Sequence, residues 1–171
     1  MTYRTKTYIA ADWDNDEDAV RILHKWNDSN YWSLSFHDVH ETTQSRDSSL
    51  YCSIKKSLKS RMDISKTFVL IVGNGTNTVT KGSCKYCYNY NSNYMNCNNG
   101  HSVDYRSYIK YECEKAVEAG ITIIVLYKST YIDKSKCPDI LRNKGKHKQM
   151  LCKGIDGNIY WDYNAVKEAF E

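Results

Sequence analysis

Residues 107–127 read SYIKYECEKAVEAGITIIVLY, and this stretch decides the fold. Its first part places apolar side chains three and four positions apart, which is the spacing of one helix face. Gly120 then ends the pattern as a helix stop. Its second part, residues 121–127, is apolar without alternation. A strand of this kind is covered on both faces, as in a parallel sheet with helices on either side.

Three other stretches predict strands. Two of them are short apolar runs that predict buried strands, at residues 7–11 and 68–72. A third, at residues 32–36, alternates between apolar and polar side chains and predicts a weaker strand. We expect residues 128–153 to be mainly loop, and residues 155–159 to turn into a short edge strand.

Helical periodicity fills the gaps between these strands. The predicted helices lie at residues 17–28, 48–62, 107–119 and 163–170, with a short one near 139–142. Regular alternation of strand and helix predicts a parallel sheet with helices on both faces, an α/β fold of the flavodoxin-like type. We predict a single domain over residues 1–171, with an insert rich in cysteine and asparagine at about residues 77–104.

Composition narrows the class of protein. The 171 residues carry a net charge of +4, and Lys144, Lys146 and Lys148 are read as solvated lysines, so no nucleic-acid partner is expected. No stretch reaches the ~18 apolar residues of a membrane span. The polar start, residues 1–6, leads into a strand and predicts no signal peptide. With seven cysteines, an odd number, we expect reduced thiols and a cytoplasmic protein.

Ligands of such sheets bind beyond the carboxyl ends of the strands. The loops at this edge are residues 12–16, 37–46 and 73–80. We therefore expect the functional site to be built from them and from the helix that begins near residue 107.

A resemblance to a known family rests on four residues, Tyr108, Glu112, Ala116 and Gly120. This pattern resembles the third helix of TIR domains. In that helix an aromatic residue comes first, a Glu follows four positions later and an Ala four positions after that, and a Gly ends the helix before an Ile/Val strand. Residues 54–76 resemble the matching upstream segment, a lysine-rich helix and a strand closed by Gly-Asn-Gly-Thr. The resemblance is to the bacterial branch that includes the Thoeris anti-phage TIR proteins.

The resemblance implies an enzyme that cleaves the bond between nicotinamide and ribose in NAD, with Glu112 as the catalytic residue. Loss of nicotinamide leaves a positively charged ribose, which a nearby carboxylate stabilises. The product would be ADP-ribose or a cyclic nucleotide signal for a downstream nucleotide-sensing effector. TIR enzymes commonly assemble, so a homo-oligomer is expected when the protein is active. The alternative is a non-enzymatic TIR-like module that signals by self-association.

Helix geometry separates Glu112 from the other acids of its helix. At 100° per residue, Glu112 lies roughly 85° from the centre of the apolar stripe, Glu114 about 115° and Glu118 about 155°. Glu112 is thus the acid nearest the buried edge, where a carboxylate can face a cleft. The alternative is an ordinary solvated glutamate.

We predict that Ala11, Asp12, Trp13, Gly73 and Tyr108 bind substrate. In TIR enzymes the first loop borders the nucleotide pocket, so Trp13 would stack on a base and Asp12 would bond a ribose. The alternative is helix-capping acids beside an exposed aromatic. The first strand also departs from the family, because it ends Ala-Ala-Asp-Trp instead of carrying a Ser-Phe or Ser-Tyr pair.

The insert holds a possible zinc site. Cys84 and Cys87 have the two-residue gap typical of such sites, and Cys97 and His101 complete four potential ligands. A metal would hold together an asparagine-rich segment that has little else to order it. Free surface thiols are the alternative. A third hypothesis for the whole protein is a nucleotide-binding receptor in which this insert closes over a ligand.

Overall fold

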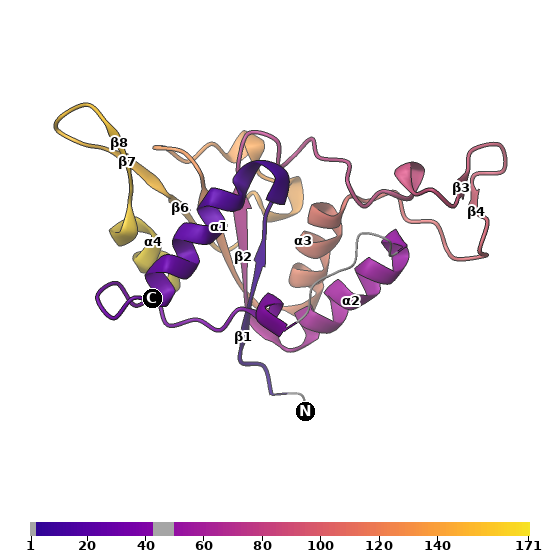
Figure 1. The fold of residues 1–171 in the computed structure, drawn as a ribbon, viewed down its shortest axis with the longest axis horizontal. Helices are drawn as coiled ribbons and strands as arrows, with labels where there is room; N and C mark the ends of the chain where they lie inside the picture. The colour runs from indigo at the N-terminus through magenta and orange to yellow at the C-terminus, as the bar shows by residue number, and fades with distance from the viewer. Residues whose placement is uncertain (1–2, 43–49) are drawn as a thin grey trace.

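A computed structural model describes residues 3–42 and 50–171 of the chain (Figure 1). Its centre is a parallel sheet in the order β1-β2-β5-β6. The four strands are β1 (Lys6–Ala10), β2 (Ser65–Val72), β5 (Thr122–Tyr127) and β6 (Lys146–Gln149). This sheet with its helices confirms the α/β, flavodoxin-like fold expected from the sequence.

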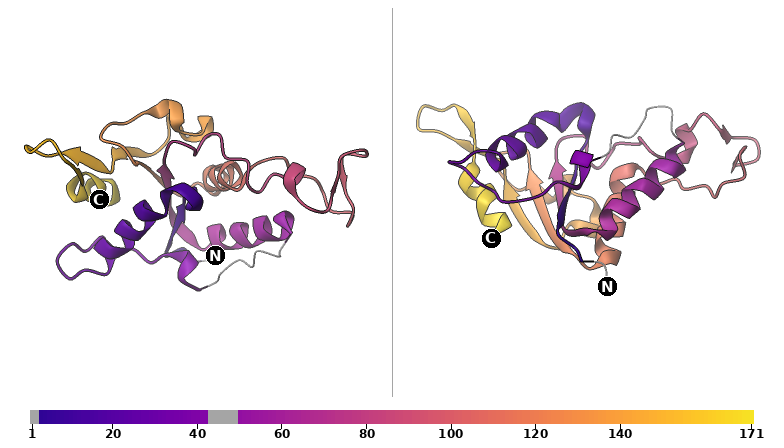
Figure 2. Two further views of the ribbon diagram at one scale, coloured as in Figure 1. Left: turned by 45° about the horizontal axis from the view of Figure 1, so that its top comes forward. Right: turned by 60° about the horizontal axis from the view of Figure 1, so that its bottom comes forward.

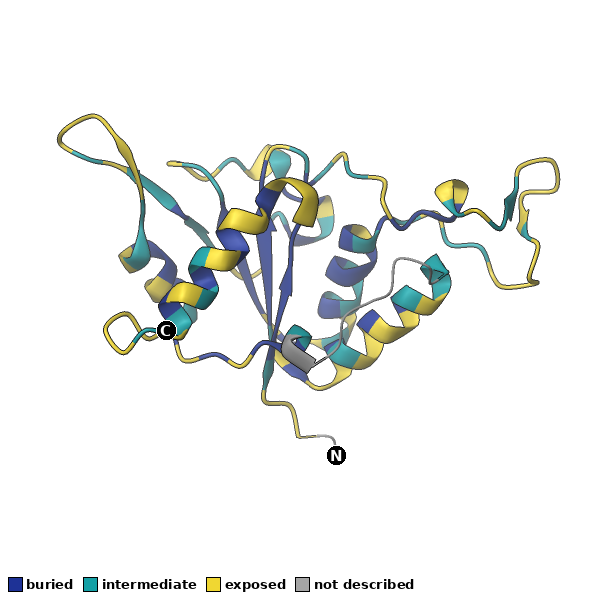
Figure 3. Ribbon diagram, viewed as in Figure 1, coloured by how far each residue is buried: buried dark blue, intermediate teal, exposed yellow. Residues whose placement is uncertain are grey.

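Helices cover both faces of the sheet, as Figures 1 and 2 show. One face packs against α1 (Trp13–Asn27) and α4 (Tyr163–Phe170), and the other against α2 (Tyr51–Asp63) and α3 (Tyr108–Ala119). Successive strand residues alternate between the two faces, so each side has its own apolar core. Tyr8 of β1, for example, joins the α2/α3 core, while Ile9 joins the α1/α4 core. Residues 7–10 of β1 and 68–72 of β2, which lie between the two helix layers, are buried (Figure 3).

The helix that decided the fold begins and ends as predicted. The Ser107 hydroxyl accepts a hydrogen bond from the backbone N–H of Lys110, which is a standard N-cap. Gly120 closes the helix with a left-handed φ of 62°, a conformation that costs glycine little. These two ends fix the position of Glu112 along α3.

The strand predicted at residues 32–36 is wrong. Ser33 and Ser35 have positive φ angles of 39° and 56°, which break an extended backbone. The Asn27 side chain also engages the backbone of Phe36, accepting from its N–H at 2.8 Å and donating to its carbonyl at 2.9 Å. Pairing of this region with β1 is reduced to one parallel bridge between Thr7 and Asp38.

The loop predicted at residues 128–153 is also wrong in part, because it contains β6 and the strand β7 (Leu151–Lys153). β6 is short and rich in lysine, so it carries none of the apolar signal of β2 and β5. β7 pairs antiparallel with β8 (Ile159–Trp161), which agrees with the edge strand predicted after residue 155. The short helix near residue 139 is present as a 3₁₀ turn, Asp139–Leu141.

The insert projects from the domain beside α2 and α3 (Figure 1). It contains a 3₁₀ turn at Cys84–Tyr86 and two strands of two residues each, β3 (Tyr90–Asn91) and β4 (Asn96–Cys97). Parts of two sequence predictions, residues 43–46 of the second loop and 48–49 of the second helix, lie outside the described residues. None of the helices described here is both long and apolar enough to span a bilayer.

Candidate functional site

The candidate site is built on residues 73–82, called here the 73–82 loop. Parallel pairing of Ala10 with Leu70 brings the ends of β1 and β2 together. A Cβ atom placed on Gly75 would lie 3.2 Å from Asp12 Oδ2. Further along the loop, the Lys81 ammonium lies 3.6 Å from the Asp14 carboxylate. The loop therefore runs along the start of α1, at the edge of the sheet where ligands of this fold class bind.

The other end of the loop meets the start of α3. The backbone N–H of Tyr108 donates to the carbonyl of Lys81 at 2.9 Å. Gly82 lies against the Tyr108 ring, since a Cβ there would come within 2.5 Å of Cδ1. One loop thus connects the predicted substrate-binding residues at the start of α1 with Tyr108 of α3. The loop also contains Gly73, another predicted substrate-binding residue.

The first-loop residues differ in exposure. Ala11 is buried in the α1/α4 core. The Asp12 carboxylate is buried and accepts from the Asn15 amide at 2.7 Å, and it makes no side-chain cap to α1. Trp13 leaves 47% of its surface exposed. Trp13 is therefore the residue of this group that is accessible to a planar ligand.

Asp16 is a site residue that the sequence reasoning missed. It is only 3% exposed, and its Oδ2 lies directly under Gly73, where a Cβ would come within 2.2 Å. Burial raises the pKa of this carboxyl, and Lys128, with Nζ 3.5 Å from Oδ1, opposes that rise. In the sequence Asp16 is one of several acids in a helix start, so no signal separated it from its neighbours.

Two buried side-chain atoms in the described part of the chain have no hydrogen-bond partner, and they belong to residues that contact the two ends of the 73–82 loop. They are Asp16 Oδ2, under Gly73, and the hydroxyl of Tyr108, whose ring contacts Gly82 through Cδ1 and Cγ. Native proteins pair nearly all such atoms, because an unpaired one costs about 1–3 kcal/mol. Unpaired atoms on two residues that contact one loop make this loop a candidate site for a polar ligand or an ordered water.

A cavity of about 240 Å³ is lined in part by residues of the same loop. It is lined by residues 77–80 and by the first turn of α3, where Ser107 and Lys110 lie. Lys85 of the insert also lines it. Two ammonium groups and a helix N-terminus favour an anionic ligand.

Glu112 lies one turn further along α3, on the same face as Tyr108. It is only 7% exposed, and the Tyr8 hydroxyl donates to its Oε1 at 2.5 Å. Burial raises the pKa of Glu112 to about 7, while the hydrogen bond from Tyr8 and the charge of Arg61 oppose that rise. The order of burial expected from the wheel is confirmed, since Glu114 is half-buried and Glu118 exposed.

A hydrogen-bonded network of one carboxylate and two imidazoles lies behind Tyr8. Its ring meets the His40 imidazole edge to face at 4.6 Å. His40 Nδ1 is 3.0 Å from Asp38 Oδ1, and His24 Nε2 is 2.9 Å from Asp38 Oδ2. Burial raises the pKa of Asp38, but the hydrogen bonds from both histidines outweigh it and leave the pKa well below its ordinary value. Asp38 therefore stays ionised and fixes both rings around β1.

Replacing Gly73 with alanine should destabilise the fold, because the new methyl group would overlap the buried Asp16 carboxylate. We expect a loss of about 1–3 kcal/mol, typical of overpacking, measured by urea unfolding. Gly75→Ala is the matched control, since its Cβ would meet Asp12 Oδ2 at 3.2 Å and need a much smaller adjustment. Adding Asp16→Ala to Gly73→Ala should recover part of the loss. Equal stability of both glycine variants would contradict the contact.

Fold and site together define a class: a TIR-like α/β domain with a polar site at the carboxyl edge of its parallel sheet. Residues 8–81 match the family model of the Thoeris protein ThsB, TIR-like domain. This match confirms the resemblance to Thoeris TIR-like domains seen in the sequence. The match includes Asp12, Asp16 and most of the 73–82 loop, and it ends before Glu112. No curated protein matches the chain.

Proposed function

We propose that this TIR-like domain binds NAD over the 73–82 loop, cleaves the bond between nicotinamide and ribose, and acts in anti-phage defence. The observation that carries this proposal is the pair of unpartnered buried atoms, Asp16 Oδ2 and the Tyr108 hydroxyl. A dinucleotide brings ribose hydroxyls for a carboxylate and phosphates for the lysines of the adjoining cavity. Trp13 offers an exposed ring for a base.

In this proposal Glu112 supplies the chemistry. Nicotinamide leaves with the electron pair of the broken bond, and C1′ of the ribose becomes positively charged. The Glu112 carboxylate stabilises that charge in a largely buried site, where a charge has a greater effect than in bulk water. Water then attacks C1′ and loses a proton, which gives ADP-ribose. Attack by a nucleophile of the same molecule gives a cyclic product instead.

For this reaction the side chains that cover the Glu112 carboxylate must move, so that substrate bound at the 73–82 loop can reach it. Tyr108 lies one helical turn above it, and Tyr8 covers its carboxyl from β1. Self-assembly of the domain is the step that we propose rearranges this layer and admits the substrate. The raised pKa adds a signature, because Glu112 acts as a carboxylate and activity should therefore rise with pH through about 7.

Purified protein at high concentration, incubated with NAD, should release nicotinamide, which chromatography measures. Glu112→Gln should lower the rate by at least ~100-fold, as loss of a charge-stabilising group does. Glu118→Gln is the matched control, since it removes an exposed acid from the same helix. Equal rates for wild type and Glu112→Gln, in a preparation shown to be assembled, would exclude this role.

The second candidate function is a non-enzymatic self-association module. It is favoured by the burial of Glu112, whose side chain is 7% exposed and is hydrogen-bonded to Tyr8 within the core. This hypothesis predicts assembly that depends on protein concentration, measured by light scattering, with the NAD concentration unchanged. The nicotinamide assay therefore separates the two candidates.

A further inference from the structure

The insert lacks the apolar core that would order it. Two strands of two residues and one 3₁₀ turn are its only regular structure. Its large side chains point outward, and the most exposed of them are Tyr86, Tyr88, Tyr94 and Met95. Small segments without a core are usually held by disulfides or a metal. The described cysteines form no disulfide.

Five potential metal ligands surround one small cavity beside α2. Cys84, Cys87, Cys97 and His101 of the insert line it, together with Cys52 from the first turn of α2. Its volume of about 10 Å³ holds roughly one water-sized sphere, so it accommodates one ion and not an organic ligand. The sequence distance from Cys52 to the insert shows that the fold, and not chain proximity alone, gathers these groups.

The backbone around the cysteines supports thiolate ligands. The N–H of Asp104 donates to Cys84 Sγ at 3.3 Å, a bond that stabilises negative charge on the sulfur. A tight turn closes between Cys84 and Cys87, where the N–H of Cys87 donates to the carbonyl of Cys84 at 3.0 Å. Gly100, with a φ of 73°, turns the chain after Cys97 and brings His101 back to the cavity.

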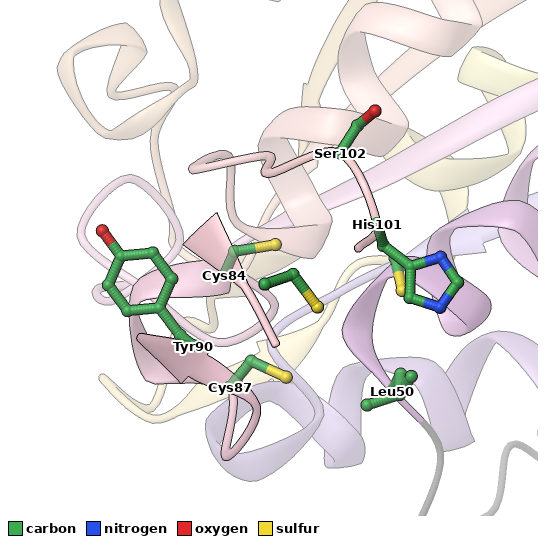
Figure 4. Close-up of a pocket in the computed structure, with 8 residues that line it drawn as sticks. Leu50, Cys84, Cys87, Tyr90, His101 and Ser102 are labelled. Atoms are coloured by element: carbon green, nitrogen blue, oxygen red, sulfur yellow. The ribbon is translucent and has the colours of Figure 1, made fainter. Parts of the chain in front are cut away.

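The side chains are not yet in a coordinating arrangement. Among the residues that the structure describes, no three His, Cys, Asp or Glu side chains stand close enough together to hold a metal ion. Figure 4 shows one reason, because the ring nitrogens of His101 are turned away from the thiols of Cys84 and Cys87. Metal binding therefore requires His101 to rotate and the thiols to move together.

We propose that Cys84, Cys87, Cys97 and His101 bind one Zn²⁺ ion and so fasten the insert to the domain. Three sulfur ligands and one imidazole match the tetrahedral preference of structural zinc. Binding releases the thiol protons to solvent, and no electron transfer is involved. Cys52 contacts the same cavity from α2 and in this assignment is a neighbour of the site, not a ligand.

The test is the zinc content of the full chain, purified from zinc-supplemented medium without chelator and measured by native mass spectrometry. Wild type should carry one zinc ion per chain. The double variant Cys84→Ser with Cys87→Ser should carry at least tenfold less. Cys152→Ser is the matched control, since it removes a partly exposed thiol from β7, and it should keep the ion. Zinc-free wild type, or a double variant with full zinc, would overturn the proposal.

Two further measurements cover misfolding and the fourth ligand. If the double variant does not fold, chelator treatment of wild type should speed amide hydrogen exchange in residues 84–101 and leave β2 and β5 protected. Exchange that is unchanged by the chelator would also overturn the proposal. His101→Ala should lose zinc and Cys52→Ser should keep it, and the opposite pattern would remove His101 from the ligand set.

Discussion

Between about pH 4.5 and 8.5, wild type should lose about 3 kcal/mol of stability relative to Glu112→Gln. The reason is the pKa of Glu112, which burial raises from an ordinary 4.5 to about 7. The folded state then favours the protonated acid. That preference stabilises the protein fully below the ordinary pKa, and it is lost as the pH rises to the folded-state value. The measurement is urea unfolding of both proteins across this pH range.

The quantity to compare is the change in unfolding free energy with pH, because its value at any single pH also contains a cost of the substitution itself. The Gln side chain keeps an oxygen for the Tyr8 hydroxyl, but it also brings an amide N–H₂ group into the core. That cost does not vary with pH, so it cancels. Glu118→Gln should follow wild type at every pH, because the group it removes is exposed. Parallel curves for wild type and Glu112→Gln would show that Glu112 titrates normally.

The second large effect is expected at Lys55, where Lys55→Met should lower the free energy of unfolding by about 2–4 kcal/mol. Lys55 is only 3% exposed. Its ammonium donates to the carbonyl of Arg106 at 2.7 Å and lies 3.4 Å from the Asp104 carboxylate. Methionine fills the same space but leaves the Arg106 carbonyl without this donor and removes the ion pair with Asp104, whose carboxylate keeps its bonds from Arg106. Urea unfolding at neutral pH measures the loss.

Lys59→Met is the matched control, one turn further along α2. Lys59 is exposed and pairs with Asp63 at the surface, so its removal should leave the urea midpoint unchanged. Lys55 also ties α2 to the segment through which the insert returns to α3. Amide exchange near residue 104 should therefore rise in Lys55→Met and not in Lys59→Met. A wild-type midpoint for Lys55→Met would contradict the role of this buried cation.

The buried elements of the fold were predictable because their signals are strong. β2 and β5 are continuous apolar runs, and α3 carries an apolar stripe and a closing glycine. β6 failed because it is a short edge strand built from lysine, histidine and glutamine, which resembles a loop. For residues 32–36 the error is the reverse, because a strand was predicted where none forms. Their alternation resembles a strand, but the Asn27 side chain engages the backbone that a strand would pair.

The candidate site was predictable in outline and not in its details. Helix geometry identified Glu112 as the buried acid of α3, and strand ends located Asp12, Trp13 and Gly73. Asp16 could not be found, because its burial depends on a contact with Gly73 from a distant part of the chain. The bond from Tyr8 to Glu112 spans 104 positions and has no local signature. Contacts of this length require the folded chain.

The lysines of β6 have a consequence for how copies of this domain can meet. β6 ends the sheet on one side, and Lys146 at its start is exposed. A second copy that added its own β6 at this edge would bring like charges together, which is a common protection against strand-to-strand aggregation. Growth of a continuous sheet through this edge is therefore disfavoured. A second copy of the domain would therefore be expected to meet it at a surface other than this edge.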